Sequence, residues 1–349
     1  MKFRLLEWLA CPGCRCEDLT LKPTKTSAAL TFNGCWEEVE VGLPGLNVET
    51  RELTEIEEGE ILCDSCGAKY DIIGGIPRMN TPNIDAKLST GHKSTQFDGQ
   101  APEYEANFLD MTLPMVAGDF IGKLVVDIGC GFGRHSYFAA QYGAEVVAMD
   151  CSSDAVEATA INCSSFSRVH PVQGDLFNPP LKRSVFDIAF CFGVLHHVDQ
   201  PEEGFRKLKE LITPSGKLQV WVYGPRQGAL AHVSKWIRAN ASDMDDKALH
   251  RLSVGLASSL RAFSHTPYRF LRHTPILKSI VTHLPAHDHH KWPFDVVVAD
   301  VYDRLRVPVT AWTTGEELER WYGDDGYADI SVTRRVRNNE SFRGTGTRR

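Results

Sequence analysis

The feature that most constrains this chain is an apolar run that ends in an acid and continues into a glycine-rich turn, Val126-Asp127-Ile128-Gly129-Cys130-Gly131-Phe132-Gly133-Arg134. Its alternating glycines are spaced differently from the G-x-G-x-x-G turn that brings a helix N-terminus up to a pyrophosphate. The shorter spacing favours a ligand without a phosphate. Because glycine turns between strand and helix also occur in α/β proteins that bind nothing there, the prediction depends on the residues that follow.

Four further apolar runs follow the glycine turn, with helical patterns between them. The runs cover residues 144–150, 170–175, 186–195 and 217–223, and the helical patterns cover 134–142, 154–162 and 202–211. Asp154, with Glu157 three residues later, resembles an N-terminal capping pair. Short buried strands that alternate with such helices predict a parallel sheet with helices on both faces.

Three of the predicted strands end in an acid: Asp127, Asp150 and Asp175. Ligands of open parallel sheets bind outside the carboxyl ends of the strands. Asp150 can accept hydrogen bonds from both hydroxyls of a ribose, and Asp175 from an adenine amino group. Asp127 and the bare backbone at Gly129 and Gly131 can meet an amino-acid moiety. Any one of these acids can be a turn or cap residue, but the ordered series favours a ligand with a positive charge, a ribose and an adenine.

From about Lys123 to Tyr223 this order and spacing resemble the class I S-adenosylmethionine-dependent methyltransferases. The stretch 127–133 is similar to the first motif of that family, Asp150 to its ribose-binding acid, and 174–177 to its adenine-binding turn. The resemblance implies an α/β fold with a Rossmann-like seven-stranded sheet. It also implies that S-adenosyl-L-methionine is the cofactor, bound by Asp127, Gly129, Gly131, Gly133, Asp150, Cys151, Asp175, Leu176 and Phe192. Phe97, Tyr104 and Phe108 lie on a predicted helix before the first strand, where Tyr104 could cover the cofactor or belong to the packed core.

The fourth-strand segment 192–198 is similar to that of family branches that methylate small molecules, including those near the quinone methyltransferases. It ends in His196 and His197, one of which could act as a general base for a hydroxyl or weakly acidic carbon acceptor. A histidine here can equally cap the next helix or pack on the sheet. The segment lacks the Asn/Asp-Pro-Pro-aromatic loop with which base-modifying N6-adenine methyltransferases hold a planar amine. One departure from the family is the predicted turn Thr213-Pro214-Ser215-Gly216, where Pro-Gly-Gly is usual.

Two C-x-x-C pairs stand near the N-terminus, Cys11 with Cys14 and Cys63 with Cys66, with 48 residues between the pairs. Four thiolates around one Zn²⁺ form a closed structural site. Gly13 and Gly67 permit the tight turns that such a site needs. Redox-active dithiols and unligated core cysteines remain alternatives, whereas a disulfide needs an oxidising compartment. Residues 5–77 resemble the short zinc-ribbon-like domains that precede or partner some methyltransferases.

The charge distribution argues against nucleic acid as a partner. The chain has a net charge of −7, and between residues 37 and 60 nine acids face a single base, Arg51. Such a surface repels phosphate, whereas nucleic-acid modules concentrate Lys and Arg. The N-terminal residues are too few and too polar for a signal peptide. We therefore expect a cytoplasmic protein without a membrane span.

The predicted organisation is a zinc-ribbon-like domain (1–79), a linker (80–94), the cofactor-binding core (95–224), a helical insertion (225–291), the completion of the core sheet (292–340) and a basic tail (341–349). The insertion contains ten Lys or Arg, four acids and eight of the thirteen His. We interpret it as a helical cap over the substrate mouth. The alternatives are amphipathic helices packed against the sheet, or a homodimer surface. Metal binding by the His-rich loop 283–290 is a weaker alternative to local hydrogen bonding.

The predicted activity is methyl transfer from S-adenosylmethionine to an O, N or C nucleophile of a small-molecule or lipid-like acceptor. One alternative is an rRNA or tRNA base methyltransferase that uses the zinc ribbon to dock RNA, which the basic insertion and tail favour. Another is a non-catalytic subunit that binds S-adenosylmethionine.

Overall fold

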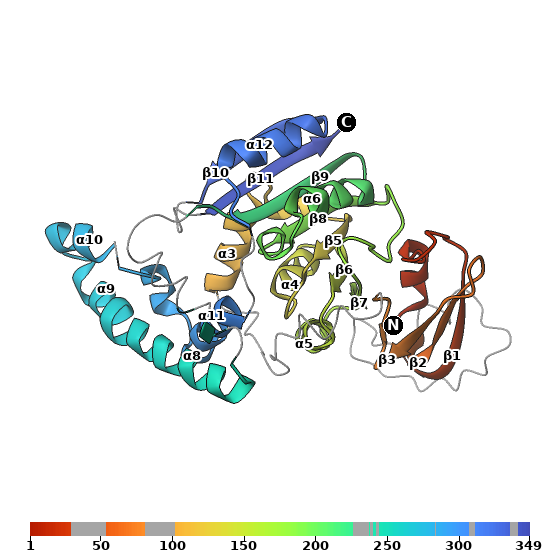
Figure 1. The fold of residues 1–349 in the computed structure, drawn as a ribbon, viewed down its shortest axis with the longest axis horizontal. Coiled ribbons are helices and arrows are strands. Elements are labelled where there is room, and N and C mark those ends of the chain that lie inside the picture. The colour runs from red at the N-terminus through yellow and green to blue at the C-terminus, as the bar shows by residue number, and fades with distance from the viewer. Residues whose placement is uncertain are drawn as a thin grey trace.

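The computed structural model describes residues 1–28, 54–80, 102–225, 237, 240–241, 244–282, 284–306, 311–335 and 341–349. Within these residues the chain forms a small N-terminal sheet, a central seven-stranded sheet and a helical insertion, which lies at the opposite end of the molecule from the N-terminal sheet (Figure 1). Some predicted features lie outside the described residues: the linker from 81, most of the acidic segment 37–60, Phe97, residues 226–236 of the insertion, and His283.

The central sheet has the strand order β10-β11-β9-β8-β5-β6-β7. The strands β5 to β9 pair in parallel, whereas β11 runs antiparallel to both of its neighbours, β9 and β10. This arrangement confirms the predicted Rossmann-like seven-stranded sheet. The strands are β5 (Leu124–Ile128), β6 (Glu145–Asp150), β7 (Val169–Gln173), β8 (Phe186–Phe192), β9 (Ile212–Tyr223), β10 (Tyr327–Arg334) and β11 (Ser341–Arg348).

Helices cover both faces of this sheet because its strands are buried on both sides. One face packs Val125 and Phe190 against α3 (Pro102–Thr112), η2 (Ala117–Phe120), α4 (Arg134–Gln141) and α5 (Ser153–Asn162). The other face packs Val126 and Val220 against α6 (Pro201–Leu211) and α12 (Gly315–Asp324). A short helix, η3 (Leu195–His197), joins β8 to α6.

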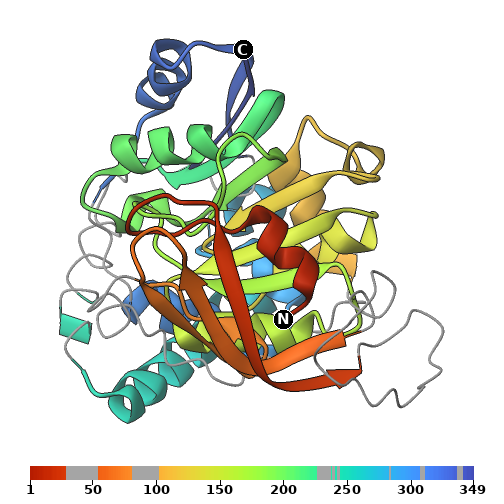
Figure 2. The same ribbon diagram turned by 90° about the vertical axis from the view of Figure 1, so that its right-hand side faces the viewer.

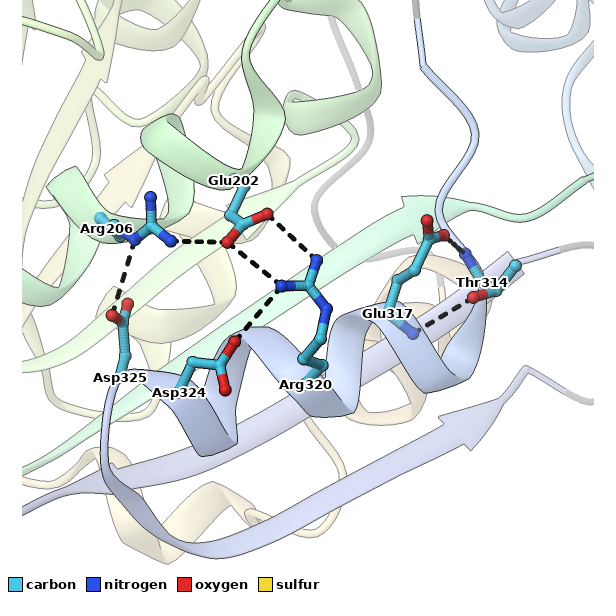
Figure 3. Close-up of polar contacts among 7 residues, drawn as sticks. All are labelled: Glu202, Arg206, Thr314, Glu317, Arg320, Asp324 and Asp325. Atoms are coloured by element: carbon cyan, nitrogen blue, oxygen red, sulfur yellow. Dashed lines mark hydrogen bonds and ion pairs between the residues drawn. The ribbon is translucent and has the colours of Figure 1, made fainter.

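An ion-pair network joins α6 to α12 (Figure 3). Arg320 of α12 donates to both carboxylate oxygens of Glu202 at 3.1 and 3.5 Å, and Arg206 donates to the same carboxylate at 2.6 Å. At its start, α12 has a capping box: Glu317 N donates to Thr314 Oγ1 at 3.1 Å, and Thr314 N donates to the Glu317 carboxylate at 2.8 Å. Exposed pairs contribute little each, so the apolar face of α12 supplies most of its attachment.

The predicted basic tail at 341–349 is wrong, because these residues form β11 in the interior of the sheet between β9 and β10. Its glycines lie under a tyrosine ring: a Cβ on Gly344 would come within 2.6 Å of Tyr322, and one on Gly346 within 2.7 Å. The arginines bind within the protein. Arg343 approaches the carboxylate of Asp110 at 3.4 Å, and Arg348 donates to Ser184 at 2.9 Å.

Two local predictions also need correction. Ser152, not Asp154, caps α5, because the Ser152 side chain accepts from Ala155 N. The predicted turn at 213–216 lies inside β9, where Ser215 has φ 66°. A side chain in this left-handed region costs roughly 1–2 kcal/mol, which is why glycine is the usual residue in such a turn.

The insertion forms its own helical cluster around Leu249, Val297 and Tyr302. Its helix α11 (Phe294–Arg306) packs against α8 (Asp246–Leu260), so the insertion extends to Arg306, beyond the predicted boundary at 291. The elements are α8 (Asp246–Leu260), the π-helical turn η4 (Arg261–His265), α9 (Thr266–Leu271), α10 (Pro275–Val281), η5 (His287–Lys291) and α11 (Phe294–Arg306). Within the described residues, every helix is too short or too polar to cross a membrane.

The N-terminal sheet has the order β1-β2-β3-β4 and lies beside the β7 edge of the central sheet (Figure 2). Met79 N donates to Gln173 O of β7 at 2.9 Å, and Lys182 N donates to Trp8 O at 2.8 Å. Backbone pairing therefore joins the two sheets. The elements are η1 (Phe3–Trp8), β1 (Leu19–Ala28), β2 (Thr54–Cys63), β3 (Lys69–Ile73) and β4 (Ile76–Pro77).

Candidate functional site

The three acids of the predicted site lie at the carboxyl ends of three neighbouring strands. Asp127 lies in β5, Asp150 is the last residue of β6, and Asp175 follows β7 by two residues. The sheet pairs β5 with β6 and β6 with β7, and Asp150 lies opposite Gln173 in register. The structure therefore brings together the carboxyl-end acids that the sequence places far apart.

The glycine turn folds back onto the end of β6. Gly129 N and Cys130 N both donate to Met149 O, at 2.7 and 3.1 Å. Gly131 N donates to the Asp150 carboxylate at 3.1 Å. One strand-end acid thus holds the turn that follows the neighbouring strand.

The three glycines of the turn have different surroundings, so glycine is required at each position for a different structural reason. All three have positive φ, but a Cβ on Gly129 would come within 2.1 Å of Val194 Cγ2, and one on Gly133 within 3.0 Å of Cys163 and Thr159. A Cβ on Gly131 would meet nothing within 4 Å. Gly129 and Gly133 therefore serve close packing, and Gly131 is the position where bare backbone borders open space.

Asp127 is fully buried and accepts from Ser136 Oγ at 2.7 Å through one carboxylate oxygen. Its other oxygen, Oδ1, has no hydrogen-bond partner among the described residues. Burial raises the pKa of Asp127 to about 6, and the neighbouring charge of Asp150 adds to this effect while the Ser136 hydrogen bond opposes it. A buried carboxylate with an unused oxygen is suited to a cationic ligand.

Asp150 and Asp175 have local hydrogen-bond partners as well. Asp150 accepts from Ser152 N at 2.9 Å as well as from Gly131 N, and burial raises its pKa. Asp175 accepts from Phe177 N at 3.1 Å in a turn. Each carboxylate has about four acceptor positions, so these contacts leave capacity for a ligand. Between these acids, the backbone oxygen of Cys151 accepts from Asn80 and Gln173.

Arg134 is a candidate site residue that the sequence reasoning missed. It is partly buried at the first position of α4, and its Nε has no hydrogen-bond partner among the described residues. Burial lowers its pKa, and its charge interacts with those of Asp300 and Asp127. A cation is unfavourable at a helix N-terminus, so an arginine directly after the glycine turn was the available sequence signal.

The two candidate bases differ in their surroundings. His196 is buried, its Nδ1 accepts from Tyr223 N at 3.3 Å, and its ring lies 3.9 Å from that of Tyr223. His197 is only partly buried, with its ring centre 4.2 Å from that of His196. His196 therefore has a packing role, and His197 is the more accessible of the pair.

The remaining predicted residues are packed against the sheet. Leu176 and Phe192 are each 7% exposed, and Phe192 stacks on Phe190 at 5.2 Å. Tyr104 of α3 is buried, and its ring lies 6.2 Å from that of Trp292 in the insertion. Lys291 also reaches Glu103 of α3 at 3.6 Å. The insertion therefore contacts the helix that contains the predicted cofactor-covering residue.

The four N-terminal cysteines form one cluster. Their Sγ atoms all lie within 4.8 Å of one another, with Cys11 to Cys66 at 3.7 Å and Cys14 to Cys63 at 3.5 Å. A disulfide has its sulfurs about 2.05 Å apart, whereas thiolates arranged tetrahedrally at about 2.3 Å from Zn²⁺ lie about 3.8 Å apart. The described cysteines are unbridged, and the donor set fits a zinc ion.

The turns behind these cysteines are equivalent. Gly67 N donates to Cys63 O with φ 72° at Gly67, and Arg15 N donates to Cys11 O with φ 66° at Arg15. Arg15 therefore takes the position predicted for Gly13. Its guanidinium donates to the backbone oxygens of Pro179 and Leu181, so this strained residue also binds the central domain.

The His-rich loop does not gather a metal site among its described residues. His287 and His290 hydrogen-bond to backbone oxygens at 3.0 Å, and His289 stacks on Trp292 at 3.8 Å. These contacts are of the local kind that the sequence favoured over metal binding for this loop.

Comparison with known proteins agrees with this arrangement. Residues 126–220 match the family described as methyltransferase domain, and residues 2–75 match the family described as Trm112p-like protein. The mitochondrial ubiquinone biosynthesis O-methyltransferase of Schizosaccharomyces pombe is 36% identical over 103 residues, which cover 28% of this chain and 37% of that protein. The tRNA U34 carboxymethyltransferase of Idiomarina loihiensis is 34% identical over 110 residues, which cover 29% and 32%.

The match spans less than half the length of both of these relatives. Among solved structures, the magnesium protoporphyrin IX methyltransferase of Synechocystis with bound SAH overlays with a TM-score of 0.41 at 17% identity, covering 74% of this chain and 91% of that chain. By sequence, residues 126–220 are similar to the methyltransferase domain family and residues 2–75 to the Trm112p-like family.

Proposed function

We propose that this protein transfers a methyl group from S-adenosyl-L-methionine to a small-molecule acceptor, a metabolite or lipid-like compound with an O, N or C nucleophile. The observation that carries the proposal is the row of Asp127, Asp150 and Asp175 at the ends of three adjacent strands, beside the open backbone of Gly131. The match to the methyltransferase domain family and the relatives named as ubiquinone biosynthesis O-methyltransferases support it.

The residues of the strand edge fit the cofactor. Asp150 would bind the ribose hydroxyls and Asp175 the adenine amino group, while Asp127 would face the cationic amino group. Arg134 supplies a positive charge for the carboxylate of the same amino-acid moiety. When bound, S-adenosylmethionine supplies a methyl group activated by its sulfonium. The protein contributes position and a dry environment, and positioning can supply roughly 7–11 kcal/mol of the barrier.

The acceptor nucleophile needs a base only if it is a hydroxyl or weakly acidic carbon. His197 is the better candidate, because His196 Nδ1 already accepts from the backbone of β9. We expect His197→Ala to lower kcat without changing cofactor affinity, whereas His196→Ala should lower the Tm as well. Full activity of both variants would remove the histidines from the reaction.

We further propose that Cys11, Cys14, Cys63 and Cys66 hold a structural zinc ion. Such an ion would fix the two knuckles that begin and end the N-terminal ribbon. Because this domain pairs with β7, the ion would stabilise the edge of the sheet beside Asp175 rather than take part in the reaction.

Two other functions compete with this proposal. The relative named as a tRNA U34 carboxymethyltransferase favours RNA as the acceptor, and the acidic segment 37–60 and the missing clamp loop oppose it. A non-catalytic subunit would also bind the cofactor, but would transfer no methyl group.

Methyl transfer from tritiated S-adenosylmethionine into host extract tests all three. The extract is separated into organic-soluble, aqueous small-molecule, RNA and protein fractions, with Asp150→Ala as the control. Label in a small-molecule fraction that depends on Asp150 supports the proposal and identifies the acceptor. Label in RNA would replace it, and cofactor binding without label in any fraction would indicate a non-catalytic subunit.

A further inference from the structure

We infer that the insertion carries a membrane-binding face, formed by η4, α9 and α10, which docks on the surface of a bilayer that contains anionic lipid. Its apolar side chains are exposed to an unusual degree: Phe263 is 77% exposed, Phe270 71%, Ile276 79% and Ile280 62%. Leu271 and Leu277 are each 36% exposed. Six of the thirteen exposed large hydrophobic side chains in the described residues therefore lie between 263 and 280.

These apolar side chains have little to pack against in the chain itself. The described residues of α9 include no buried side chain, and α10 buries only Val281. Ile276 and Ile280 are four residues apart and so lie on the same side of α10. Figure 1 shows α9 and α10 at the far end of the molecule, away from the central sheet. The three elements are neighbours in the fold, and exposed apolar side chains gathered on neighbouring elements mark an interaction site.

The charges around this face select the occupant. From residue 247 to residue 287 the sequence has six Lys or Arg and no acid, in a chain whose net charge is −7. Arg269 and Lys278 are exposed beside the apolar side chains, and Arg272 is partly exposed. Apolar side chains flanked by basic ones, on short helices that cannot span a bilayer, are the signature of a helix that lies in the membrane interface. A second copy of this chain would instead bring like charges together.

The same insertion contacts α3, the helix that contains the predicted cofactor residue Tyr104. Arg261 of η4 donates to the backbone oxygen of Trp292 at 2.8 Å, and Trp292 lies against Tyr104 of α3. A protein docked through α9 and α10 would therefore be linked to α3 through η4 and Trp292. The inference rests on exposure and charge alone, so it stands or falls independently of the proposed methyl transfer.

Co-sedimentation of the full chain with lipid vesicles tests the inference. We expect binding to vesicles of phosphatidylcholine with phosphatidylglycerol that exceeds binding to phosphatidylcholine alone and weakens as salt rises, since salt screens surface charge. The double variant Phe270→Ser/Ile276→Ser should lose about tenfold or more of its partitioning. Arg269→Gln/Lys278→Gln should lose the preference for phosphatidylglycerol while keeping the residual apolar binding.

Ile121→Ser is the matched control, because Ile121 is 71% exposed and lies outside the insertion; it should bind vesicles like the unaltered protein. All of these positions are exposed, so the variants keep the folded core, which circular dichroism verifies. Failure of the unaltered protein to sediment with either vesicle at low salt would overturn the inference. It would also be overturned by light scattering that shows a dimer which Phe270→Ser/Ile276→Ser converts to a monomer, because the face would then join two copies.

Discussion

At the scale of single residues, Asp150 connects the elements that form the proposed cofactor site at the carboxyl ends of β5, β6 and β7. Its two carboxylate oxygens accept from Gly131 N and Ser152 N, so one side chain positions both the glycine turn and the start of α5. A ligand that binds Asp150 therefore meets an acid whose position is already fixed by the backbone. Preorganisation of this kind reduces the entropy lost on binding.

The change Asp150→Asn should weaken the binding of both S-adenosylmethionine and its demethylated product. A hydrogen bond to a charged group contributes roughly 1.5–3 kcal/mol, so the Kd measured by isothermal titration calorimetry should rise about tenfold or more. Asp187→Asn is the control, since Asp187 accepts from Leu124 N at the start of β5, at the end of the strands opposite to Asp150. An unchanged Kd in Asp150→Asn would contradict the assignment of this acid to the cofactor.

Asp127 should make cofactor binding depend on pH. Burial raises its pKa to about 6 in the folded protein, above the ordinary 3.8. The protonated carboxyl therefore adds to the free energy of unfolding. This contribution is complete below pH 3.8, the pKa of the unfolded state, and is lost as the pH rises through about 6. A cationic ligand prefers the ionised form, so affinity should rise about tenfold from about pH 5 to pH 7. Calorimetry at each pH measures this, and Asp127→Asn should abolish the rise.

At the scale of elements, two glycines with opposite surroundings test how β11 and α8 are built. The Tyr322 ring lies over Gly344 of β11, where a Cβ would come within 2.6 Å of Cε2, whereas a Cβ on Gly255 of α8 would meet nothing within 4 Å. Tyr322 is fully buried, and its hydroxyl donates to Leu218 O at 3.1 Å. Strand β11 and helix α12, which contains Tyr322, therefore have complementary surfaces.

We expect Gly344→Ala to destabilise the protein by about 1–3 kcal/mol, the usual cost of overpacking. In contrast, Gly255→Ala should stabilise it by about 0.5–1 kcal/mol, because alanine loses less backbone entropy in a helix. Urea unfolding monitored by circular dichroism compares the two. If both variants changed the free energy of unfolding by the same amount, Tyr322 would be able to move aside without cost. Packing against Tyr322 would then not explain the glycine at position 344.

At the scale of the whole molecule, the N-terminal sheet and the central sheet depend on each other. The first cysteine knuckle binds the loop after β7 through Arg15, and Met79 pairs with β7 itself. The proposed zinc ion would therefore stabilise more than the domain that holds it.

Cys63→Ser should remove zinc and lower the Tm of the full chain, because a structural zinc ion contributes directly to folding. Cys16→Ser is the matched control, since Cys16 is a free, partly exposed cysteine outside the four-sulfur cluster. Elemental analysis should find about one zinc per chain in the control and none in Cys63→Ser. Equal zinc content in the two variants would contradict the proposed site.

The sequence by itself determined the central features of this protein because their signals are local. The alternation of strands and helices, the glycine turn after Asp127, the capping box at Thr314 and the two cysteine pairs are periodicities or short spacings. They predicted a parallel sheet with three acids at the carboxyl ends of its strands, and the resemblance to the methyltransferase family implied that the sheet has seven strands. That these acids bind a cofactor stays a proposal.

Only the tertiary structure decided the rest, because those features depend on residues distant in sequence. The stretch 341–348 has glycines instead of an apolar pattern, and it becomes a strand because Tyr322 fills the space above them. Gly129 is needed because Val194 lies against it, and Arg134 is partly buried where its charge interacts with that of Asp300 in the insertion. Packing between distant segments leaves no short pattern, so the docking of the N-terminal sheet and the exposed face of α9 and α10 emerged only from the folded chain.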